Sequence, residues 1–315
     1  MQMRSRAVVM AALAMLAMVT LAFEAQAYDS ASAGDAAIRE QFDAFLVRYG
    51  KHYAAASDEY EHRLGIFTHN LAKIAARNAK YAGKTQHGIT QFADMTQEEF
   101  QNRVLMRPPP LPTEKRVRGP TYAGLKAPTS FDWRNKTGVV TPVYNQGQAF
   151  SATENIESQW ALAGNKLTEL AMQQIVDCDS TDSGCGGGWP YNAYEYVMSA
   201  PGLEPLADYP YTAADGNCAY NSGEVVAKIS DWTYTTTDQD EHQMANYLAQ
   251  HGPISVCVDA SQWSLYTVGY NLAANPPYWI IRNSWGADWG LQGYMYLEFG
   301  QDACAVAQVS TSSIV

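Results

Sequence analysis

Acyl transfer by a nucleophilic side chain needs a thiol or hydroxyl next to a base, which is most often a histidine. The chain has five cysteines and six histidines, but beyond residue 104 its only histidines are His242 and His251. His242 falls in a segment predicted to form an exposed helix, and His251 precedes a loop glycine, so both are expected at the surface. Ser151 has no nearby base, and the better candidate nucleophile, Cys185, has none either; an unactivated thiol stays mostly protonated at acidic pH.

The composition of the 315 residues is that of a globular protein large enough for more than one structural unit. The net charge of −11 would repel nucleic acid and anionic membranes, so neither is expected as a partner. It suits an acidic compartment, in which carboxylates are partly neutralised. We predict no cofactor and no metal site.

Residues 1–27 have the features of a secretory signal: Arg4 and Arg6, an apolar run from Ala7 to Phe23, and the cleavage triplet Ala25-Gln26-Ala27. A membrane anchor is the alternative, but the run is marginal in length and no stop-transfer flank follows it. We therefore expect a protein that enters the secretory pathway and has no membrane span in its mature part. Its destination would be a lysosome-like compartment or the outside of the cell.

Two helical patterns follow the signal. The first ends at Gly50 and has an apolar stripe of Phe42, Phe45, Leu46 and Tyr49. The second places six residues, three or four apart, on one helical face: Glu59, Arg63, Phe67, Asn70, Ile74 and Asn78. A generic amphipathic helix is one interpretation, but four of the six side chains are polar, which is unusual for a face that only packs.

A proline-rich connector at 107–112 and an exposed basic run at 115–118 precede a compact domain that we place from about residue 127. Asn135-Lys136-Thr137 is a glycosylation sequon if the chain is secreted. A helix with an apolar stripe is predicted after Phe150, ending at Gly164. Strand-like segments begin near Val225, a short helix is predicted over 240–250, and a buried strand over 252–260.

Several of these motifs resemble those of one protein family. The order E-x3-R-x3-F-x2-N-x3-I-x3-N over 59–78 resembles the propeptide helix of cathepsin L-like peptidases, and Gly88, Phe92 and Asp94 resemble that propeptide's G-x-N-x-F-x-D motif. The blocks at 131–134, 176–178, 184–188 and 278–286 are similar to those of papain-like cysteine peptidases. Residues 147–148 and 181–185 resemble in particular the trypanosomatid type.

The resemblance implies an α+β papain-like fold of two domains, a helical left domain and a β-barrel-like right domain, preceded by a helical inhibitory propeptide. It divides the chain into a signal peptide (1–27), an inhibitory propeptide (28–126) and a peptidase domain (127–315). In the family the propeptide lies along the active cleft and blocks it. The expected partners are therefore the chain's own propeptide and a peptide or protein substrate.

The resemblance is interrupted twice. Residues 145–148 and 149–152 resemble the two flanks of the catalytic cysteine, but the Cys-Gly-Ser-Cys-Trp that the family places between them is missing at Gln148-Ala149, the first junction. By resemblance Gln146 is the side-chain donor of the oxyanion hole. The nucleophile that it would serve is not in the sequence.

The second junction is Thr267-Val268. There the family has a long stretch with a disulfide cysteine and Asp/Asn-His-x-Val, whose histidine is the catalytic base. By resemblance Asn283 orients that histidine, and Trp285 shields their hydrogen bond. We expect the loss of this stretch to remove an edge of the barrel core.

The cysteines agree with two missing segments. By resemblance Cys178 pairs with Cys218, whereas the partners of Cys185 and Cys304 would have stood inside the missing segments. Cys257 lies on the predicted buried strand and is expected to be a small core residue. Three of the five cysteines should then be free thiols.

Three hypotheses remain. The chain is a catalytically inactive peptidase homologue made as a zymogen, or an active cysteine endopeptidase whose recorded sequence lacks two segments, or a non-catalytic peptide-binding or decoy protein. For peptide binding, Gly187 and Gly188 would offer backbone hydrogen bonds, as the resemblance implies. An apolar pocket for a Leu or Phe side chain would have its base at Val309 and walls at Trp189, Pro190 and Ala260, and would reject Arg.

Overall fold

The computed structural model describes residues 34–80, 87–103, 127–144, 150–236, 238–258 and 263–315. The predicted signal, the proline-rich connector and the basic run lie outside these residues. The chain divides into two compact units, Met1–Glu98 and Glu99–Val315. Among the described residues, every helix is too short or too polar to cross a bilayer.

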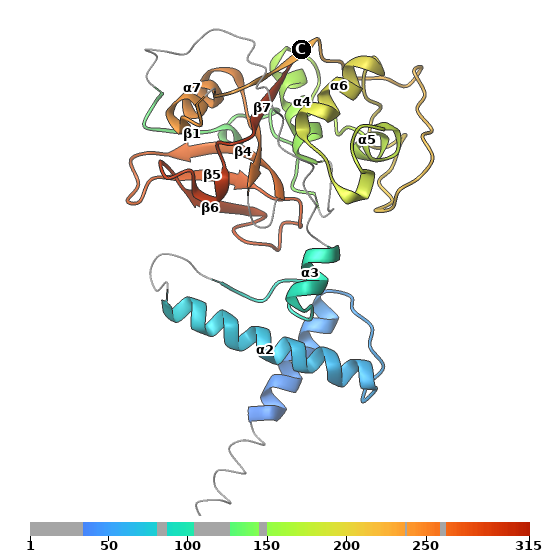
Figure 1. Ribbon diagram of the computed structural model, residues 1–315, viewed down its shortest axis with the longest axis vertical. Coiled ribbons are helices and arrows are strands. Elements are labelled where there is room, and N and C mark those ends of the chain that lie inside the picture. Colours follow the sequence, from blue (N-terminus) through green and yellow to red (C-terminus); the bar gives the residue numbers. More distant parts are fainter. Residues whose placement is uncertain (1–33, 81–86, 104–126, 145–149, 237, 259–262) are drawn as a thin grey trace, which may run out of the picture. The chain divides into compact units, whose positions relative to one another are not determined.

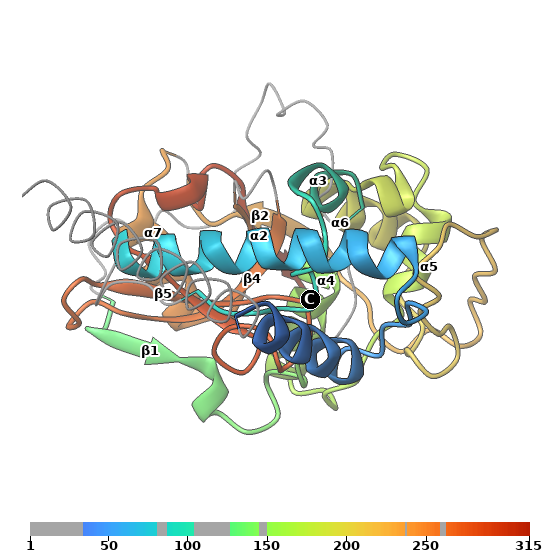
Figure 2. The same cartoon turned by 90° about the horizontal axis from the view of Figure 1, so that it is seen from below.

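Two helices form the core of the first unit. One covers residues 34–48, and the other is α2 (Asp58–Lys80), an uninterrupted helix in Figures 1 and 2. They pack around an aromatic cluster in which Phe42 and Phe67 are fully buried, with ring centroids 5.2 Å apart. The chain turns at Gly50 with a φ of +61°, a conformation that favours glycine. Both predicted helices are confirmed.

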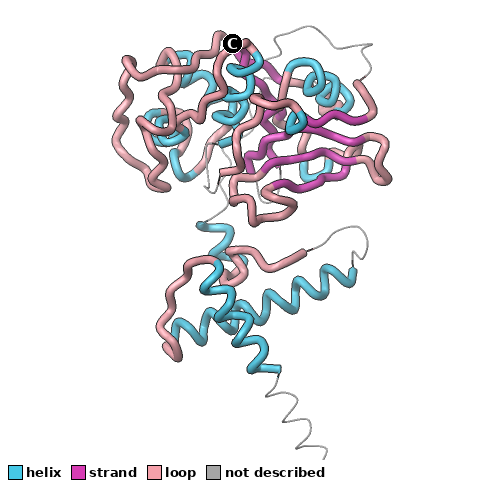
Figure 3. Tube along the Cα trace, turned by 180° about the vertical axis from the view of Figure 1, so that it is seen from behind, coloured by secondary structure: helices cyan, strands magenta, loops and turns pink. Residues whose placement is uncertain are grey.

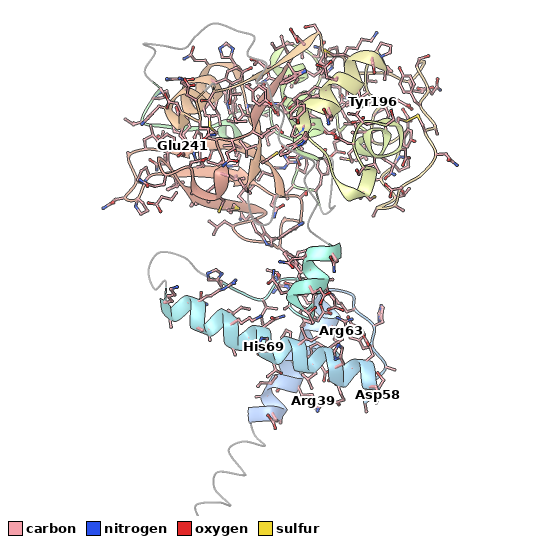
Figure 4. All side chains as sticks on the ribbon, in the orientation of Figure 1. Arg39, Asp58, Arg63, His69, Tyr196 and Glu241 are labelled. Carbon is pink, nitrogen blue, oxygen red and sulfur yellow. A yellow bond between two sulfur atoms is a disulfide. The ribbon has the colours of Figure 1, made fainter. Side chains whose placement is uncertain are left out.

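The polar residues of the α2 stripe bind the backbone of residues 87–95. Arg63 (Figure 4) donates to the carbonyl of Asp94 at 3.1 Å, and Asn70 donates to two carbonyl groups nearby, each at 2.9 Å. Asn78 donates to the carbonyl of His87 at 2.9 Å and accepts from its amide at 2.6 Å. The stripe is therefore polar because it holds an irregular segment, whose buried amides and carbonyls need partners. The short helix α3 (Gln97–Arg103) follows that segment.

In the second unit, three helices gather on one side, and the strands lie on the other side together with helix α7 (Glu241–His251) (Figures 1 and 3). The helical side contains α4 (Phe150–Leu162), α5 (Met172–Cys178) and α6 (Pro190–Ser199). Gln174 of α5 donates to the hydroxyl of Tyr196 on α6 at 3.0 Å (Figure 4). Short 3-10 helices connect the elements: η1 (Trp133–Asn135), η2 (Gly184–Gly186) and η3 (Ala303–Ala305).

Seven described strands form one antiparallel sheet. They are β1 (Ser130–Asp132), β2 (Asp231–Tyr234), β3 (Ile254–Val258), β4 (Trp263–Asn271), β5 (Tyr278–Arg282), β6 (Tyr294–Glu298) and β7 (Ser310–Ile314). The order is β2-β7-β3-β4-β5-β6, with β1 also paired to β4. The predicted change from helices to strands is confirmed, and with it the α+β fold class.

Strand β4 runs through the second junction without a break. Its first part pairs with β3, from Val258↔Trp263 to Ile254↔Thr267, and its later part pairs with β5, with a bulge between Thr267 and Gly269. The sheet is therefore continuous across the junction, and the expected loss of a barrel edge stays a prediction. Because the ladder uses backbone amides and carbonyls, the segment before the junction takes up a strand position regardless of its side chains.

Helix α7 (Glu241–His251) packs on the sheet (Figure 1) and is capped by Asp240, whose carboxylate accepts from the amide of His242 at 2.8 Å. The prediction of an exposed helix is right only for one face. Leu248 on the other face is fully buried, and Glu241 (Figure 4) accepts from the Trp279 indole at 2.6 Å.

Candidate functional site

Asn283, the predicted orienting residue, follows β5 and is 3% exposed. Its backbone amide donates to the carbonyl of Gly293 at 3.0 Å, and its side-chain oxygen accepts from the amide of Ser284 at 2.8 Å. The side-chain nitrogen Nδ2 is buried and has no hydrogen-bond partner among the described residues. An unmatched buried amide costs about 1–3 kcal/mol, so such groups are rare in folded proteins.

Trp285, the predicted shielding indole, is half-buried in an aromatic cluster. Its ring stands edge-on to Trp289 at 5.4 Å and to Phe100 at 5.7 Å between centroids. The indole lies two residues after Asn283 in the chain, and its aromatic neighbours are Trp289 and Phe100.

The first junction and Gln146 lie outside the described residues, as does Ala260. Helix α4 is described from its first turn onward, where the Ser151 side chain is 2% exposed. The hydroxyl of Ser151 is in close contact with the hydroxyl of Ser255 on β3. A serine hydroxyl is not a base strong enough to activate another serine, which argues against Ser151 as a nucleophile.

The glycines of the predicted cleft wall lie next to the start of α4. Gly187 has a φ of +103°, and a Cβ on Gly188 would come within 2.0 Å of Asp182 Oδ2. Asp182 accepts from the amide of Trp189 at 3.1 Å and from Asn192 Nδ2 at 2.7 Å, and burial raises its pKa to about 6. Both positions therefore require glycine, one for its backbone conformation and one for space.

A small pocket opens at this wall. It is lined by both glycines, Trp189 and Pro190, together with Ser151 and Ala152 of α4. Val309 is 2% exposed and belongs to the same apolar cluster as Trp189, but it does not line the pocket. The structure thus brings together four of the predicted pocket residues, with Val309 behind them.

The cysteines confirm one predicted pair. Cys178 and Cys218 form a disulfide with their Cα atoms 4.7 Å apart, while Cys185, Cys257 and Cys304 are thiols. Cys257 is half-buried at the margin of a core cluster rather than inside it, where it was expected. Burial, and then the nearby carboxylate of Asp215, raise the pKa of Cys185 to about 11. Its thiol is therefore a poorer nucleophile than an ordinary cysteine.

The two histidines of this unit lie on α7, and both are exposed. His242 stands edge-on to Phe299 at 5.1 Å, and His251 is 4.8 Å from the ring of Tyr247. The hydrogen bond that Asn283 accepts comes from Ser284, not from a histidine. Among the described residues, Asn283 and Trp285, for which supporting roles are predicted, are not accompanied by a thiol and imidazole pair.

Comparison with known protein families shows which family this chain belongs to. The model for the papain family cysteine protease matches residues 127–267 and 261–314, and the model for the cathepsin propeptide inhibitor domain (I29) matches residues 42–100. The chain belongs to the papain family of cysteine proteases. The two segments that match the papain-family model overlap at residues 261–267, next to the second junction.

Individual relatives agree with this family. "Cysteine proteinase 1" of Dictyostelium discoideum is 36% identical over 88% of this chain and 93% of its own, and "Cysteine proteinase" of Trypanosoma brucei brucei is 39% identical over 87% and 67%. Among solved structures, the digestive procathepsin L2 proteinase of Tenebrio molitor has a TM-score of 0.80 at 32% identity, covering 88% of this chain and all of that one. The papain-like fold with a helical propeptide region is thereby confirmed.

The length of one alignment is informative. The match to the Dictyostelium protein extends over 324 positions, although it uses only 88% of a chain of 315 residues. This papain-family relative therefore contains residues that have no counterpart here.

One group of residues escaped the sequence reasoning. Glu154 and Glu157 of α4 and Arg282 of β5 are all at most 3% exposed. Arg282 Nη2 lies 2.8 Å from Glu154 Oε1, and the same guanidinium donates to the carbonyls of Thr141 at 2.6 Å and Pro142 at 2.7 Å. Arg282 immediately precedes Asn283, so this buried group fixes the strand end on which the candidate site depends.

Proposed function

We propose that this papain-family protein is a non-catalytic homologue produced as a zymogen. The observation that carries the proposal is the Asn283 side-chain nitrogen, which is buried without a hydrogen-bond partner among the described residues. By resemblance the carboxamide of Asn283 would orient a histidine base, with its oxygen accepting from the ring N–H; here that oxygen accepts from the amide of Ser284. The surroundings of Asn283 are kept, but the group that it would serve is missing from the sequence.

The remaining nucleophiles support the same conclusion. Ser151 is buried against Ser255, and the thiol of Cys185 has a pKa raised to about 11, mainly by burial. At the acidic pH expected for a lysosome-like compartment, a thiol with this pKa is almost entirely protonated.

The full chain should be tested on fluorogenic dipeptide substrates and casein between acidic and neutral pH. We expect no turnover. The matched control is a chimera in which both junctions receive the corresponding segments of the Dictyostelium relative, which shows that the assay detects an active form. Turnover by the unmodified chain that an epoxide inhibitor of cysteine peptidases abolishes would overturn the proposal.

The alternative is an active endopeptidase whose recorded sequence lacks two segments that its gene encodes. It is favoured by the retention of Asn283, Trp285 and the glycine wall. Sequencing the transcript across both junctions separates the two accounts. Transcripts that encode both segments would establish the active enzyme.

A chain without catalysis should also fail to process itself. In the family, propeptide removal is largely self-catalysed at low pH, so residues 28–126 should stay attached to residues 127–315 unless another protease cuts between them. Purified protein would be held at acidic pH and followed by mass spectrometry. Shortening near Ala127 in a sample free of other proteases would contradict this.

Peptide binding without cleavage is the second candidate function, and the pocket beside the glycine wall favours it. Its volume is about 40 Å3, room for about three water molecules. A small apolar side chain fits this space as it stands, and Leu or Phe fits if the walls move. Asp182 also lines the pocket, but burial raises its pKa to about 6, so at acidic pH an Arg would bury its charge beside a mostly protonated carboxyl.

Calorimetric titration tests this candidate on propeptide-free protein. Three peptides that differ at one position, Ala, Leu or Arg, would be compared. We expect Ala or Leu to bind and Arg to bind much more weakly. Equal affinities, or no binding by any of the three, would end the binding hypothesis and favour a nonfunctional gene copy.

Passage through the secretory pathway completes the proposal. Residues 1–27 would act as the signal, and the product would reside in a lysosome-like compartment or outside the cell. The acidic net charge of −11 and the Cys178–Cys218 disulfide both suit this route. Edman sequencing of the exported chain should begin at Tyr28.

A further inference from the structure

The chain contains a single N-x-S/T triplet in which x is not proline, Asn135-Lys136-Thr137. Asn135 ends η1 and the chain then turns, with all three residues of the triplet exposed. Neither the Asn135 nor the Thr137 side chain makes a hydrogen bond to another described residue. An acceptor amide on an exposed turn, with no other partner there, is available for modification.

The surface next to the triplet is aromatic. Arg134 lies over the ring of Tyr294, 4.6 Å from its centroid, and Tyr296 is close enough to contribute to raising the pKa of its guanidinium. Tyr296 on β6 is 46% exposed and stacks on the half-buried Tyr278 of β5, with centroids 4.3 Å apart and planes 11° from parallel. The residue before the acceptor thus lies beside a tyrosine pair with one exposed ring.

These two observations together point to one occupant. We infer that Asn135 carries an N-linked glycan whose first sugars cover the tyrosine pair Tyr278–Tyr296. The inference rests on the secretory route in the proposed function, but not on the absence of catalysis.

The chemistry of both partners fits. A sugar ring presents an apolar face of C–H bonds and a polar edge, and tyrosine presents an apolar ring with a polar hydroxyl. Tyr296 is one of the few large apolar side chains left exposed among the described residues. Covering it with the chain's own glycan removes apolar surface from water without a second protein.

The first experiment measures occupancy. The full chain would be expressed in yeast or insect cells, and the intact mass of the exported protein compared before and after peptide-N-glycosidase. We expect a mass loss of one N-glycan. Asn135→Gln and Thr137→Ala should lack it, whereas Thr137→Ser, which keeps the triplet, should retain it.

An exported chain whose mass the glycosidase leaves unchanged overturns the inference, and so does a chain that never enters the secretory pathway. Either result is independent of peptidase assays, so it is distinguishable from a failure of the non-catalytic proposal.

The second experiment tests the contact. Thermal unfolding would be compared for glycosylated and enzymatically deglycosylated protein, in the wild type and in Tyr296→Ser. We expect glycan removal to lower the Tm of the wild type and to have a smaller effect in the variant. Equal shifts in both proteins would refute contact with the tyrosine pair.

Discussion

The buried ion pair between Glu154 of α4 and Arg282 of β5 gives a quantitative prediction. Arg282 is 1% exposed, and replacing Glu154 by Ala removes a carboxyl that pairs with its guanidinium. The guanidinium still donates to the neutral carbonyls of Thr141 and Pro142. Removing one partner of a buried pair costs about 3–5 kcal/mol, out of a total stability of about 5–15 kcal/mol. We expect the lower end at neutral pH, because burial raises the pKa of Glu154 to about 8, so that its carboxyl is mostly protonated there and the pair carries only part of its charge.

The matched control removes both charges. In the double variant Glu154→Met/Arg282→Met, apolar side chains of similar volume fill the site, and such replacements are often neutral or stabilising by about 1–4 kcal/mol. Urea unfolding followed by tryptophan fluorescence would measure each variant. The double variant should be more stable than either single variant. If the two single losses simply add, the charges are not coupled and the reasoning fails.

The same group predicts how stability depends on pH. Burial raises the pKa of Glu154 from 4.5 to about 8 and that of Glu157 from 4.5 to about 7. The folded state therefore holds protons that the unfolded state releases, so this stabilisation is complete below pH 4.5 and is lost as pH rises through 7 and 8. The free energy of unfolding should fall between about pH 5 and 8, and less steeply in Glu154→Gln. A rise over that range would refute the assignment.

Further predictions concern single sites. Asn283→Ser removes the unmatched amide, so the free energy of urea unfolding should stay within about 1 kcal/mol of the wild type or rise. The control Asn155→Ser removes an amide that has partners and should cost about 1–3 kcal/mol. A larger loss for the Asn283 variant than for the Asn155 variant would contradict this. Gly188→Ala places a methyl group against Asp182 and should lower the free energy of unfolding by about 1–3 kcal/mol. The control Gly65→Ala adds a methyl group that meets nothing within 4 Å and should cause no such loss. Equal losses in the two variants would argue against the steric account. Thiol titration of denatured protein should find three free cysteines; finding one would mean that a second disulfide has formed.

Much of this fold could be predicted because its motifs are local and ordered. The polar stripe at Glu59, Arg63, Asn70 and Asn78 has helical spacing, and the Cys178–Cys218 pair follows from the resemblance. The supporting residues Asn283 and Trp285 were found in the same way. What their side chains contact could not be predicted, since an unmatched amide is a property of the packed structure.

The buried charges of α4 could not be predicted from an apolar stripe. That pattern assigns polar residues to solvent, but α4 contacts α6 and strands β3, β4 and β7, which leave its first two turns without a solvent face. The continuity of β4 also escaped prediction. The resemblance marks where side chains are missing, whereas strand pairing depends on the backbone that remains.

That continuity has an evolutionary consequence. Cells discard proteins that misfold, so a coding deletion in a central strand would ordinarily be eliminated at the protein level. Here the residues on both sides of the second junction form strand β4, whose first part pairs with β3 and whose later part pairs with β5. Under the proposed function, a deletion of this kind would escape quality control and still abolish a reaction. Selection on folding and selection on catalysis then act separately, and a gene can lose catalysis while its product still folds.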